Sequence, residues 1–363
     1  MSFDVTLKAW LALSLTRGVS GESARRLLKE FGSPDAIFAA SGASLKAIVK
    51  TGVATEITKG YTEETVAPVL SWLEDNNNHI VTLADKEYPQ ALLNIPDPPI
   101  LLYVKGRLDL LNSTAMAIVG SRNATPQGSS NAEAFAKSLS DAGLCIISGM
   151  AHGIDAAAHR GALHGQGSSI AIIGTGMDKV YPAANRDLAH SLAQQGTLIS
   201  EFPLGTPPLA SNFPRRNRLI SGMSIGCLVV EASLQSGSLI TARLAAEQGR
   251  DVFAIPGSIH APQSKGCHTL LKQGAKLVES AQDILEEISG LLPIAAHNSV
   301  NKSTEIPDTG HVLLEHIGFD PVDIDTLSAR CGLTIAELSA MLLTFELEGR
   351  ISTLPGGLYQ RIK

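Results

Sequence analysis

The hydrophobic positions follow three different patterns along the chain. Over residues 1–78 apolar residues recur at helical spacing, as in the run from Leu7 to Leu15, and Gly32-Ser33-Pro34 is typical of one helix ending and the next beginning. From Ile80 onwards, short apolar runs alternate with helical patterns. After residue 310, three helical patterns precede a strand pair. The chain is therefore expected to fold as three regions of different kinds.

The middle region, residues 79–289, has the pattern of a doubly wound sheet. Some of its apolar runs are unbroken, as in Ile170-Ala171-Ile172-Ile173, which is typical of parallel strands buried on both faces. Strands are expected at 80–83, 100–104, 115–119, 144–148, 169–173, 197–200, 227–230, 251–255 and 276–278. Helices are expected at 127–142, 153–164, 186–195, 218–223, 239–248 and 266–274. This alternation predicts an α/β fold with a Rossmann-type, mainly parallel sheet.

The first region, residues 1–78, is helical and carries one suggestive turn. Arg17-Gly18-Val19-Ser20, followed by apolar residues at helical spacing, resembles a helix-hairpin-helix, which directs backbone amides at phosphates. Thr51-Gly52-Val53 is a weaker echo of the same pattern. A plain helical interaction module of the SAM kind explains these residues as well, and it is the interpretation we favour.

The last region, residues 310–363, predicts a winged helix. Helices are expected at 311–317, 323–330 and 335–348, followed by a hairpin, and residues 290–309 have the composition of a linker. Winged helices often bind duplex DNA. The third helix carries Glu337, Glu346 and Glu348 and no Lys or Arg, so phosphate repulsion opposes DNA docking. This composition favours a protein-binding or self-binding role.

Charge is distributed without a basic domain. The chain of 363 residues has a net charge of −6, and residues 79–289 carry 16 Lys and Arg against 17 Asp and Glu. A phosphate-binding site must therefore be a local cluster. The four cysteines are far apart, and no run reaches the roughly 18 apolar residues of a membrane span. We expect free thiols, a cytoplasmic location and no membrane attachment.

The densest basic cluster follows Phe213. Arg215, Arg216 and Arg218 lie within four positions at the expected start of a helix, where positive charge opposes the helix dipole unless anions bind. A salt-bridged turn has weaker support, because no Asp or Glu occurs between residues 203 and 227. We interpret Arg215, Arg216, Asn217 and Arg218 as a phosphate grip, with Phe213 stacking a base.

Other loops at the carboxyl ends of the strands carry polar residues. Gly120-Ser121-Arg122 offers amides and a guanidinium to a phosphate, although an ordinary turn fits equally well. His152, Asp155 and His159 have spacings that allow a metal or acid–base site, but we favour a structural role with Asp155 in the first turn of a helix. No complete dinucleotide fingerprint and no catalytic dyad is found, so neither a cofactor nor a metal is expected. Ser236 and Ser238 fit a helix cap or an anion site equally well.

Six motifs in order resemble one family. They are G-S-R at 120–122, S-G-M-A-x-G-I-D-x-x-A-H at 148–159, G-T-G-x-D-x-x-Y-P at 174–182, S-E-F-P at 200–203, F-P-R-R-N-R-L-I-S-G at 213–222 and S-G-S-L-I-T-A at 236–242. Together they are similar to the DprA/Smf DNA-processing proteins. The resemblance is strong over about residues 80–300, and the helical start and winged-helix end agree with it in order.

The resemblance implies a role in recombination. Family members bind and protect incoming single-stranded DNA during natural transformation in competent cells, and load the RecA recombinase onto it past single-strand binding protein. The family implies an extended Rossmann-like fold, a homodimer, no catalytic turnover, and a DNA pocket that includes Arg122 and the segment from Phe213 to Arg218. Ala210 stands where some members carry a lysine, and Arg215 occupies a variable position that partly compensates.

Two other functions remain open from the residues alone. Rossmann-like nucleotide hydrolases of the phosphoribohydrolase type share glycine loops and phosphate arginines. Their P-G-G-x-G-T-x-x-E signature is not matched after Glu231, where the chain reads A-S-L-Q-S-G-S-L-I-T-A. In the second alternative the protein is a scaffold whose winged helix recruits partners, and its DNA binding is incidental.

Overall fold

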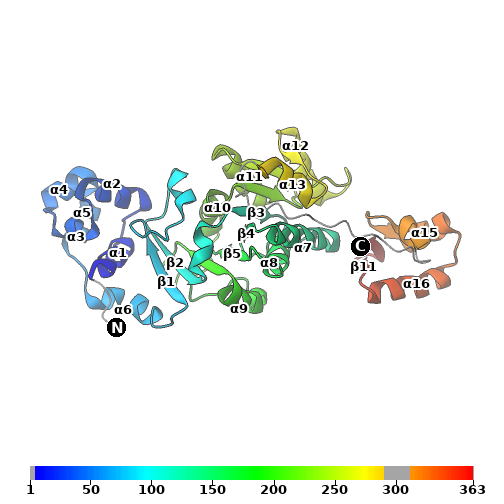
Figure 1. Ribbon diagram of the computed structural model, residues 1–363, viewed down its shortest axis with the longest axis horizontal. Helices are drawn as coiled ribbons and strands as arrows, with labels where there is room; N and C mark the ends of the chain where they lie inside the picture. The colour runs from blue at the N-terminus through cyan, green and yellow to red at the C-terminus, as the bar shows by residue number, and fades with distance from the viewer. Residues whose placement is uncertain (1–4, 290–310, 363) are drawn as a thin grey trace.

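The computed structural model describes residues 5–289 and 311–362, and its three groups of elements lie in a row (Figure 1). The first group is helical, as expected. Its helices are α1 (Val5–Leu15), α2 (Gly21–Phe31), α3 (Pro34–Ala39), α4 (Gly42–Ile48), α5 (Thr51–Thr58) and α6 (Glu63–Trp72).

Helix starts in this group follow from short polar side chains. Ser20 caps α2 by accepting from the amide of Ser23, while the Ser23 hydroxyl accepts from the Ser20 amide. Gly32 ends α2 with a φ of 81°, and Ser33 and Pro34 begin α3. The predicted break at residues 32–34 is therefore confirmed.

The central sheet contains a strand at every position where the pattern predicts one. Its strands are β1 (Asn78–Thr82), β2 (Leu101–Gly106), β3 (Ala115–Val119), β4 (Cys145–Ser148), β5 (Ser169–Ile172), β6 (Thr197–Ser200), β7 (Gly226–Val229), β8 (Asp251–Ala254) and β9 (Lys276–Leu277). Their order is β1-β2-β6-β5-β4-β3-β7-β8-β9. Strand β2 pairs antiparallel with β1 and β6, and the strands from β6 to β9 pair in parallel. The fold is thus the expected Rossmann-like, mainly parallel sheet.

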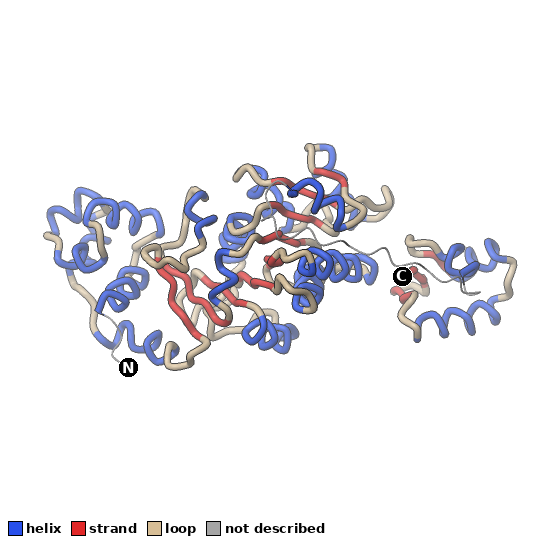
Figure 2. The backbone as a smooth tube through the Cα atoms, in the orientation of Figure 1, coloured by secondary structure: helices blue, strands red, loops and turns tan. Residues whose placement is uncertain are grey.

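Helices cover both faces of this sheet (Figure 2). They are α7 (Pro126–Asp141), α8 (Ile154–Leu163), α9 (Arg186–Gln195), α10 (Asn212–Gly222), α11 (Ser238–Glu247), α12 (Lys265–Lys272) and α13 (Ala281–Ile288), with short 3-10 turns η1 (Gln90–Asn94), η2 (Leu108–Asn112), η3 (Ala183–Asn185) and η4 (Pro262–Ser264). Helix α13 was not predicted. The predicted start of the helix at Arg218 is wrong by six residues, because α10 begins at Asn212 and includes Pro214 in its first turn, where proline is tolerated.

The helical group shares a hydrophobic core with the sheet. Leu11, Leu27 and Ile57 belong to the same buried cluster as Leu101 and Tyr103 of β2. Burial of this kind stabilises the contact between the two parts, because apolar area removed from water contributes about 25 cal/mol per Å². The boundary at residue 78 marks a change of pattern, and the independence of the two parts as domains stays a prediction.

The C-terminal group is a winged helix. Helices α14 (His311–Ile317), α15 (Ile324–Cys331) and α16 (Ile335–Leu347) pack with strands β10 (Val322–Asp323), β11 (Ile351–Leu354) and β12 (Leu358–Arg361), in the order β10-β12-β11. The predicted linker at 290–309 lies outside the described residues. Within the described ranges, no single helix has the length and apolar character to cross a membrane; α15 and α16 pass that test only as a pair, bent by 107°.

Candidate nucleic-acid interface

A pocket of about 590 Å³ opens at the carboxyl ends of β3 and β7. These neighbouring strands mark the point where the sheet order reverses, since β4 lies on one side of β3 and β7 on the other. Doubly wound sheets bind ligands at this switch point. Of the residues predicted for the site, those that line the pocket are Gly120, Ser121, Arg122, Phe213, Arg216 and Asn217. Sequence positions about ninety residues apart therefore meet here.

An aromatic and cationic wall forms one side of this pocket. The Arg122 guanidinium lies 5.6 Å from the centre of the Phe213 ring, and the rings of Phe213 and Tyr181 are 5.6 Å apart at 39°. Arg122 is exposed, and no ion pair with another described residue occupies its guanidinium. It can therefore bind a phosphate without first breaking an ion pair. Tyr181, which is 45% exposed, was missed as a site residue; its only signal was an aromatic side chain in a glycine-rich loop.

Arg216 lines the pocket, and its guanidinium is hydrogen-bonded to the protein backbone. It is 4% exposed and donates from Nη1 to the carbonyl oxygens of Gly149, at 2.6 Å, and Ile172. These carbonyls end β4 and β5, so the guanidinium joins two strand ends. Burial lowers the pKa of Arg216 to about 10, and the nearby Asp155 carboxylate opposes this shift. Arg216 stays charged at neutral pH. Its hydrogen bonds to the two carbonyl oxygens leave fewer of its N–H donors available to a ligand than the sequence predicted.

Asp155 and His159 have the structural roles that the sequence favours. Asp155 lies in the first turn of α8 and accepts from the amides of Gly149 and Ala151 at 3.1 and 3.3 Å. Burial raises the pKa of Asp155, while Arg216 and these amides counteract part of the rise. His159 lies 2.8 Å from the Ser169 hydroxyl, and burial, with Arg216 nearby, lowers its pKa to about 3. No metal-binding cluster is found within residues 5–289 and 311–362.

Gly149 is expected to be essential for this arrangement. A Cβ at Gly149 would come 2.1 Å from Nη1 of Arg216, so Gly149→Ala should displace the guanidinium and lower the free energy of unfolding by about 1–3 kcal/mol. Chemical denaturation measures the loss. Gly52→Ala is the control, because nothing lies within 4 Å of its Cβ and alanine favours the helix that holds it. Equal stability of the Gly149 variant and the parent protein would contradict this assignment.

The Gly120–Thr125 loop is held by Glu231, which follows β7. The Glu231 carboxylate accepts from the amide of Thr125 at 2.9 Å and from its hydroxyl at 2.5 Å. The Ser121 amide donates to the Glu231 carbonyl at 2.7 Å, so the expectation that it is offered to a phosphate is wrong. Gly120 packs closely, since a Cβ there would lie 2.6 Å from Ile154. The main role of this loop is therefore to position Arg122, and binding of anions by the loop itself is secondary.

The opposite side of the pocket is the N-terminus of α11. Ser236, Gly237 and Ser238 line it, and the Ser236 and Ser238 hydroxyls are 2.7 Å apart. Gly237 is the N-cap residue, and because glycine has no side chain, the helix start has no side-chain cap. The amides of Ser238, Leu239 and Ile240 already donate to the Ser236 hydroxyl and to the carbonyl oxygens of Ser236 and Gly237, at 3.4, 3.2 and 3.1 Å. The helix dipole, more than free amides, therefore favours a negative group at this end. Arg122, Ala210 and Asn217 line the same pocket.

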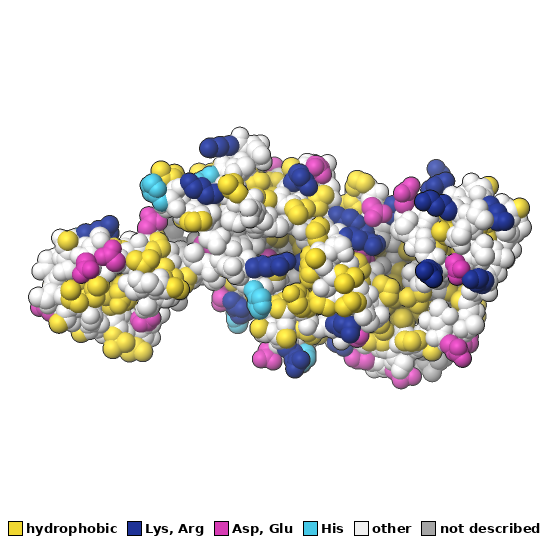
Figure 3. Space-filling model, turned by 180° about the vertical axis from the view of Figure 1, so that it is seen from behind, with side chains coloured by type: hydrophobic (Ala, Val, Ile, Leu, Met, Phe, Trp, Pro, Cys, Tyr) yellow, Lys and Arg dark blue, Asp and Glu magenta, His cyan; other side chains and the backbone are white. Residues whose placement is uncertain are grey.

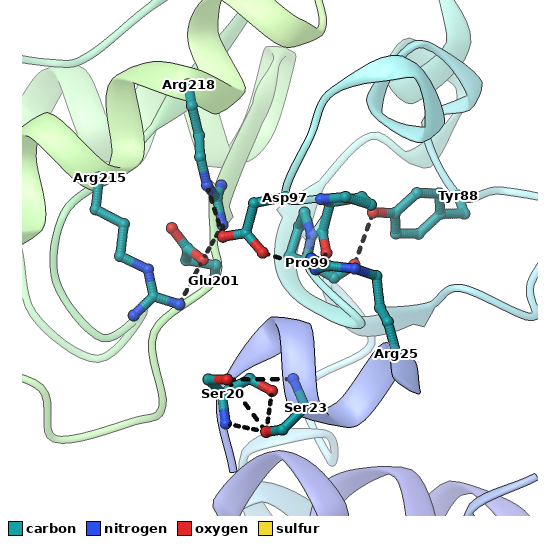
Figure 4. A network of polar contacts seen from close by, with 10 residues as sticks. Ser20, Ser23, Arg25, Tyr88, Asp97, Pro99, Glu201, Arg215 and Arg218 are labelled. Carbon is teal, nitrogen blue, oxygen red and sulfur yellow. Dashed lines mark hydrogen bonds and ion pairs between the residues drawn. The ribbon is translucent and has the colours of Figure 1, made fainter. Parts of the chain in front are cut away.

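Arg215 and Arg218 line a different hollow and are ion-paired (Figure 4). Arg218 lies 2.7 Å from Glu201 and 3.4 Å from Asp97, and Arg215 lies 3.0 Å from Glu201. The argument against a salt-bridged turn is therefore wrong: the partners lie outside the interval 203–227 that contains no acidic residue. Because α10 starts at Asn212, Arg216 and Arg218 also lie past its first turn. DNA contact by Arg215 and Arg218 stays a prediction.

The surface charge agrees with a local site. On the face shown in Figure 3, Lys and Arg side chains occur in small groups interspersed with Asp and Glu, without a continuous basic surface. A protein that binds nucleic acid mainly through long-range attraction has a basic face or stripe. Residues 79–289 as a whole also carry 16 Lys and Arg against 17 Asp and Glu, so specific contacts in the pocket are the better candidate for binding.

These features define a Rossmann-like ligand-binding protein with an appended winged helix. The family model described as DNA recombination-mediator protein A matches residues 79–289, and the DprA winged helix domain model matches residues 301–357. The chain belongs to the DprA/Smf family of DNA-processing proteins. It is 44% identical over 313 residues to Protein Smf of Escherichia coli (strain K12), a match that covers 84% of this chain and 82% of that protein.

Two solved structures agree with this assignment. DNA processing protein A from Streptococcus pneumoniae superposes with a TM-score of 0.69 and 38% identity, over 79% of this chain and 99% of that one. DNA processing protein A from Helicobacter pylori, whose single-stranded DNA binding mode has been described, gives a TM-score of 0.54 and 30% identity, over 58% of this chain and 96% of that one.

Proposed function

We propose that the protein binds single-stranded DNA in the pocket at the switch point of the sheet. The observation that carries the proposal is the position of Arg122: an exposed guanidinium without an ion pair to a described residue, next to Phe213 and opposite the N-terminus of α11. The guanidinium can bind a phosphate in bidentate fashion, and an unstacked base can lie against the rings of Phe213 and Tyr181. The single-stranded DNA binding of the Helicobacter pylori relative supports this choice of ligand.

The same geometry favours binding over catalysis. Asp155 is the one carboxylate among the described residues that line the pocket, and two backbone amides already hold it. Glu231 is engaged by Thr125, and His159 is buried and neutral. A general acid or base must be able to reach the substrate with a pKa near the working pH. We therefore propose a binding protein without catalytic turnover.

We infer that bound DNA is passed to a recombinase. The family description as a recombination mediator supports a role in which the protein protects incoming single strands and loads RecA onto them past single-strand binding protein, in the cytoplasm and during natural transformation. We propose that it acts as a homodimer. The winged helix presents an acidic α16, with Glu337 and Glu346 in the helix and Glu348 as its C-cap, which favours a protein partner over duplex DNA.

A titration with labelled oligo(dT) and a duplex of equal length tests the DNA-binding proposal. We expect the single strand to bind more tightly, because only unstacked bases can reach Phe213 and Tyr181. The log-affinity should fall with log salt at a slope of about −0.7 for each phosphate neutralised, or about −1 to −2 in all. The experiment uses the full chain at two salt concentrations. Equal affinity for the two forms, or no binding of either, would overturn the proposal.

A further inference from the structure

Helix α16 of the winged helix, labelled in Figure 1, has a second apolar face, which is exposed. On its inner face, Leu338, Leu342 and Phe345 are buried in the core of the winged helix. Its outer face carries four exposed apolar residues in one line: Ala336, Ala340, Leu343 and Leu347. Leu343 is 58% exposed and Leu347 is 81% exposed. The solvent face of a surface helix is normally polar, so this outer stripe has the character of a contact surface.

The outer stripe has the spacing of a seam between two helices. Its residues follow one another at intervals of four, three and four, as at the a and d positions of a coiled coil. The stripe is also graded in size, because its two alanines lie toward the amino end of the helix and its two leucines toward the carboxyl end. A small residue leaves room for a large side chain from a facing helix, and close packing requires such pairs.

This gradation is self-complementary in an antiparallel pair of helices. Ala336 and Leu347 are equally far from the middle of the stripe, and the same holds for Ala340 and Leu343. A two-fold axis through the middle therefore places each alanine opposite a leucine of the second helix. An interface between two identical copies needs this reciprocity, because one patch serves both sides. A helix of a different protein needs no such symmetry, so the pattern favours a second copy of this chain.

The acidic residues near the stripe are engaged within their own domain. Glu337 accepts from the amide and the hydroxyl of Thr334 at 2.9 and 2.7 Å. Glu346 accepts from a backbone amide of β11 at 3.3 Å, and Glu348 lies 3.7 Å from Arg350. Helical spacing places Glu337 and Glu346 at the sides of the stripe, outside the seam. Their like charges in two copies oppose pairing at low ionic strength, so added salt should strengthen it.

We propose that the outer stripe of α16 is a self-association surface on which α16 of a second copy packs antiparallel. The helix has 13 residues and is therefore about 20 Å long. One pair of such helices covers less than the roughly 800 Å² per partner that is typical of a stable complex. The contact is weak by itself and joins copies that are already held close together, as on one DNA strand. It does not depend on the DNA pocket, so either proposal stands if the other fails.

Sedimentation velocity of the full chain over a range of concentrations is the first test. The mean mass of the parent should rise with concentration, and more steeply at higher salt. Leu343→Glu places a charge in the seam and should end the rise at a lower mass. Ile335→Glu is the matched control, because Ile335 is 51% exposed, lies off the stripe and begins the helix, where a negative charge is favourable. Equal association of Leu343→Glu and the parent, or a parent mass independent of concentration, would overturn the proposal.

An exchange of small and large residues tests the packing itself. Ala340→Leu adds apolar area but places two leucines opposite each other, so association should weaken about tenfold. Adding Leu343→Ala again places a leucine opposite an alanine and should recover the association of the parent. Both positions are exposed, so the far-ultraviolet circular dichroism should stay unchanged. Stronger association of Ala340→Leu alone would indicate contact without defined packing and would overturn the proposal.

Cross-linking tests the direction of the two helices. The background is Cys331→Ser, since the other three cysteines are buried. A mixture of Ala336→Cys and Leu347→Cys should form disulfide-linked dimers under mild oxidation, because the two positions face each other across the seam. Each variant alone should form few, because the two-fold axis places identical residues at opposite ends. Dimers of one variant with itself, or no dimers in the mixture, would overturn the antiparallel pairing.

Discussion

Arg122→Ala is expected to lower the affinity for single-stranded DNA about ten- to a hundredfold, the equivalent of about 1.5–3 kcal/mol for hydrogen bonds to a charged group. The guanidinium is exposed and lies 5.6 Å from the Phe213 ring, so the change removes the proposed phosphate contact and one side of the proposed base platform. The slope of log-affinity against log salt should become less steep by about 0.7. Gel shifts and fluorescence titrations at two salt concentrations measure both effects.

The fold should not change in this variant. Arg122 has no ion pair with a described residue, and surface substitutions of this kind usually alter stability by less than about 0.5 kcal/mol. Arg243→Ala is the matched control, because it removes one positive charge from an exposed side chain that pairs with Glu247. It should bind DNA like the parent.

The Arg122 variant should also fail to promote RecA assembly on DNA coated with single-strand binding protein. Undiminished DNA binding by Arg122→Ala would exclude the pocket.

Arg216→Met is expected to reduce the free energy of unfolding by about 3–5 kcal/mol, because removing one partner leaves a buried charge uncompensated. The carbonyls of Gly149 and Ile172 lose their donor, and the buried Asp155 loses its nearest cation. Urea denaturation measures the loss. Arg186→Met, at an exposed position, should change stability by less than about 0.5 kcal/mol. A weak effect at Arg216 would mean that this side chain is free to bind DNA.

The loss in the Arg216 variant should depend on pH in a defined direction. Burial raises the pKa of Asp155 in the folded protein, so ionisation of Asp155 costs stability as the pH rises through that pKa, and the cost is absent below the unfolded value. Without Arg216 the pKa rises further. The deficit should therefore shrink as the pH falls from neutrality toward the ordinary carboxyl pKa of 3.8. Adding Asp155→Asn should recover part of the stability at the higher pH, and a deficit that grows on acidification would contradict this account.

Local patterns predicted most of the fold. Unbroken apolar runs such as Ile170 to Ile173 place strands that are buried on both faces, because only parallel sheets covered on both sides bury every residue. The start of α10 was misplaced, since Pro214 and three arginines obscure a helix that begins at Asn212. Helix α13 is short and was overlooked. In α10 polar residues outnumber the apolar ones, whereas α13 has apolar residues at helical spacing and a Ser280–Asp283 capping box that would have predicted it.

The sequence by itself determined the fold class and the family, because these depend on periodicity and on motifs that are continuous in the chain. That Arg122, Phe213 and Arg216 share one pocket was only implied by the resemblance, and the structure brings them together there. Only the tertiary structure decided which of the charged side chains are ion-paired and which are buried. Glu201 and Asp97 reach Arg215 and Arg218 from distant segments, and the ends of β4 and β5 bury Arg216. Ion pairing and burial depend on distances through space, and a linear spacing of arginines carries no information about them.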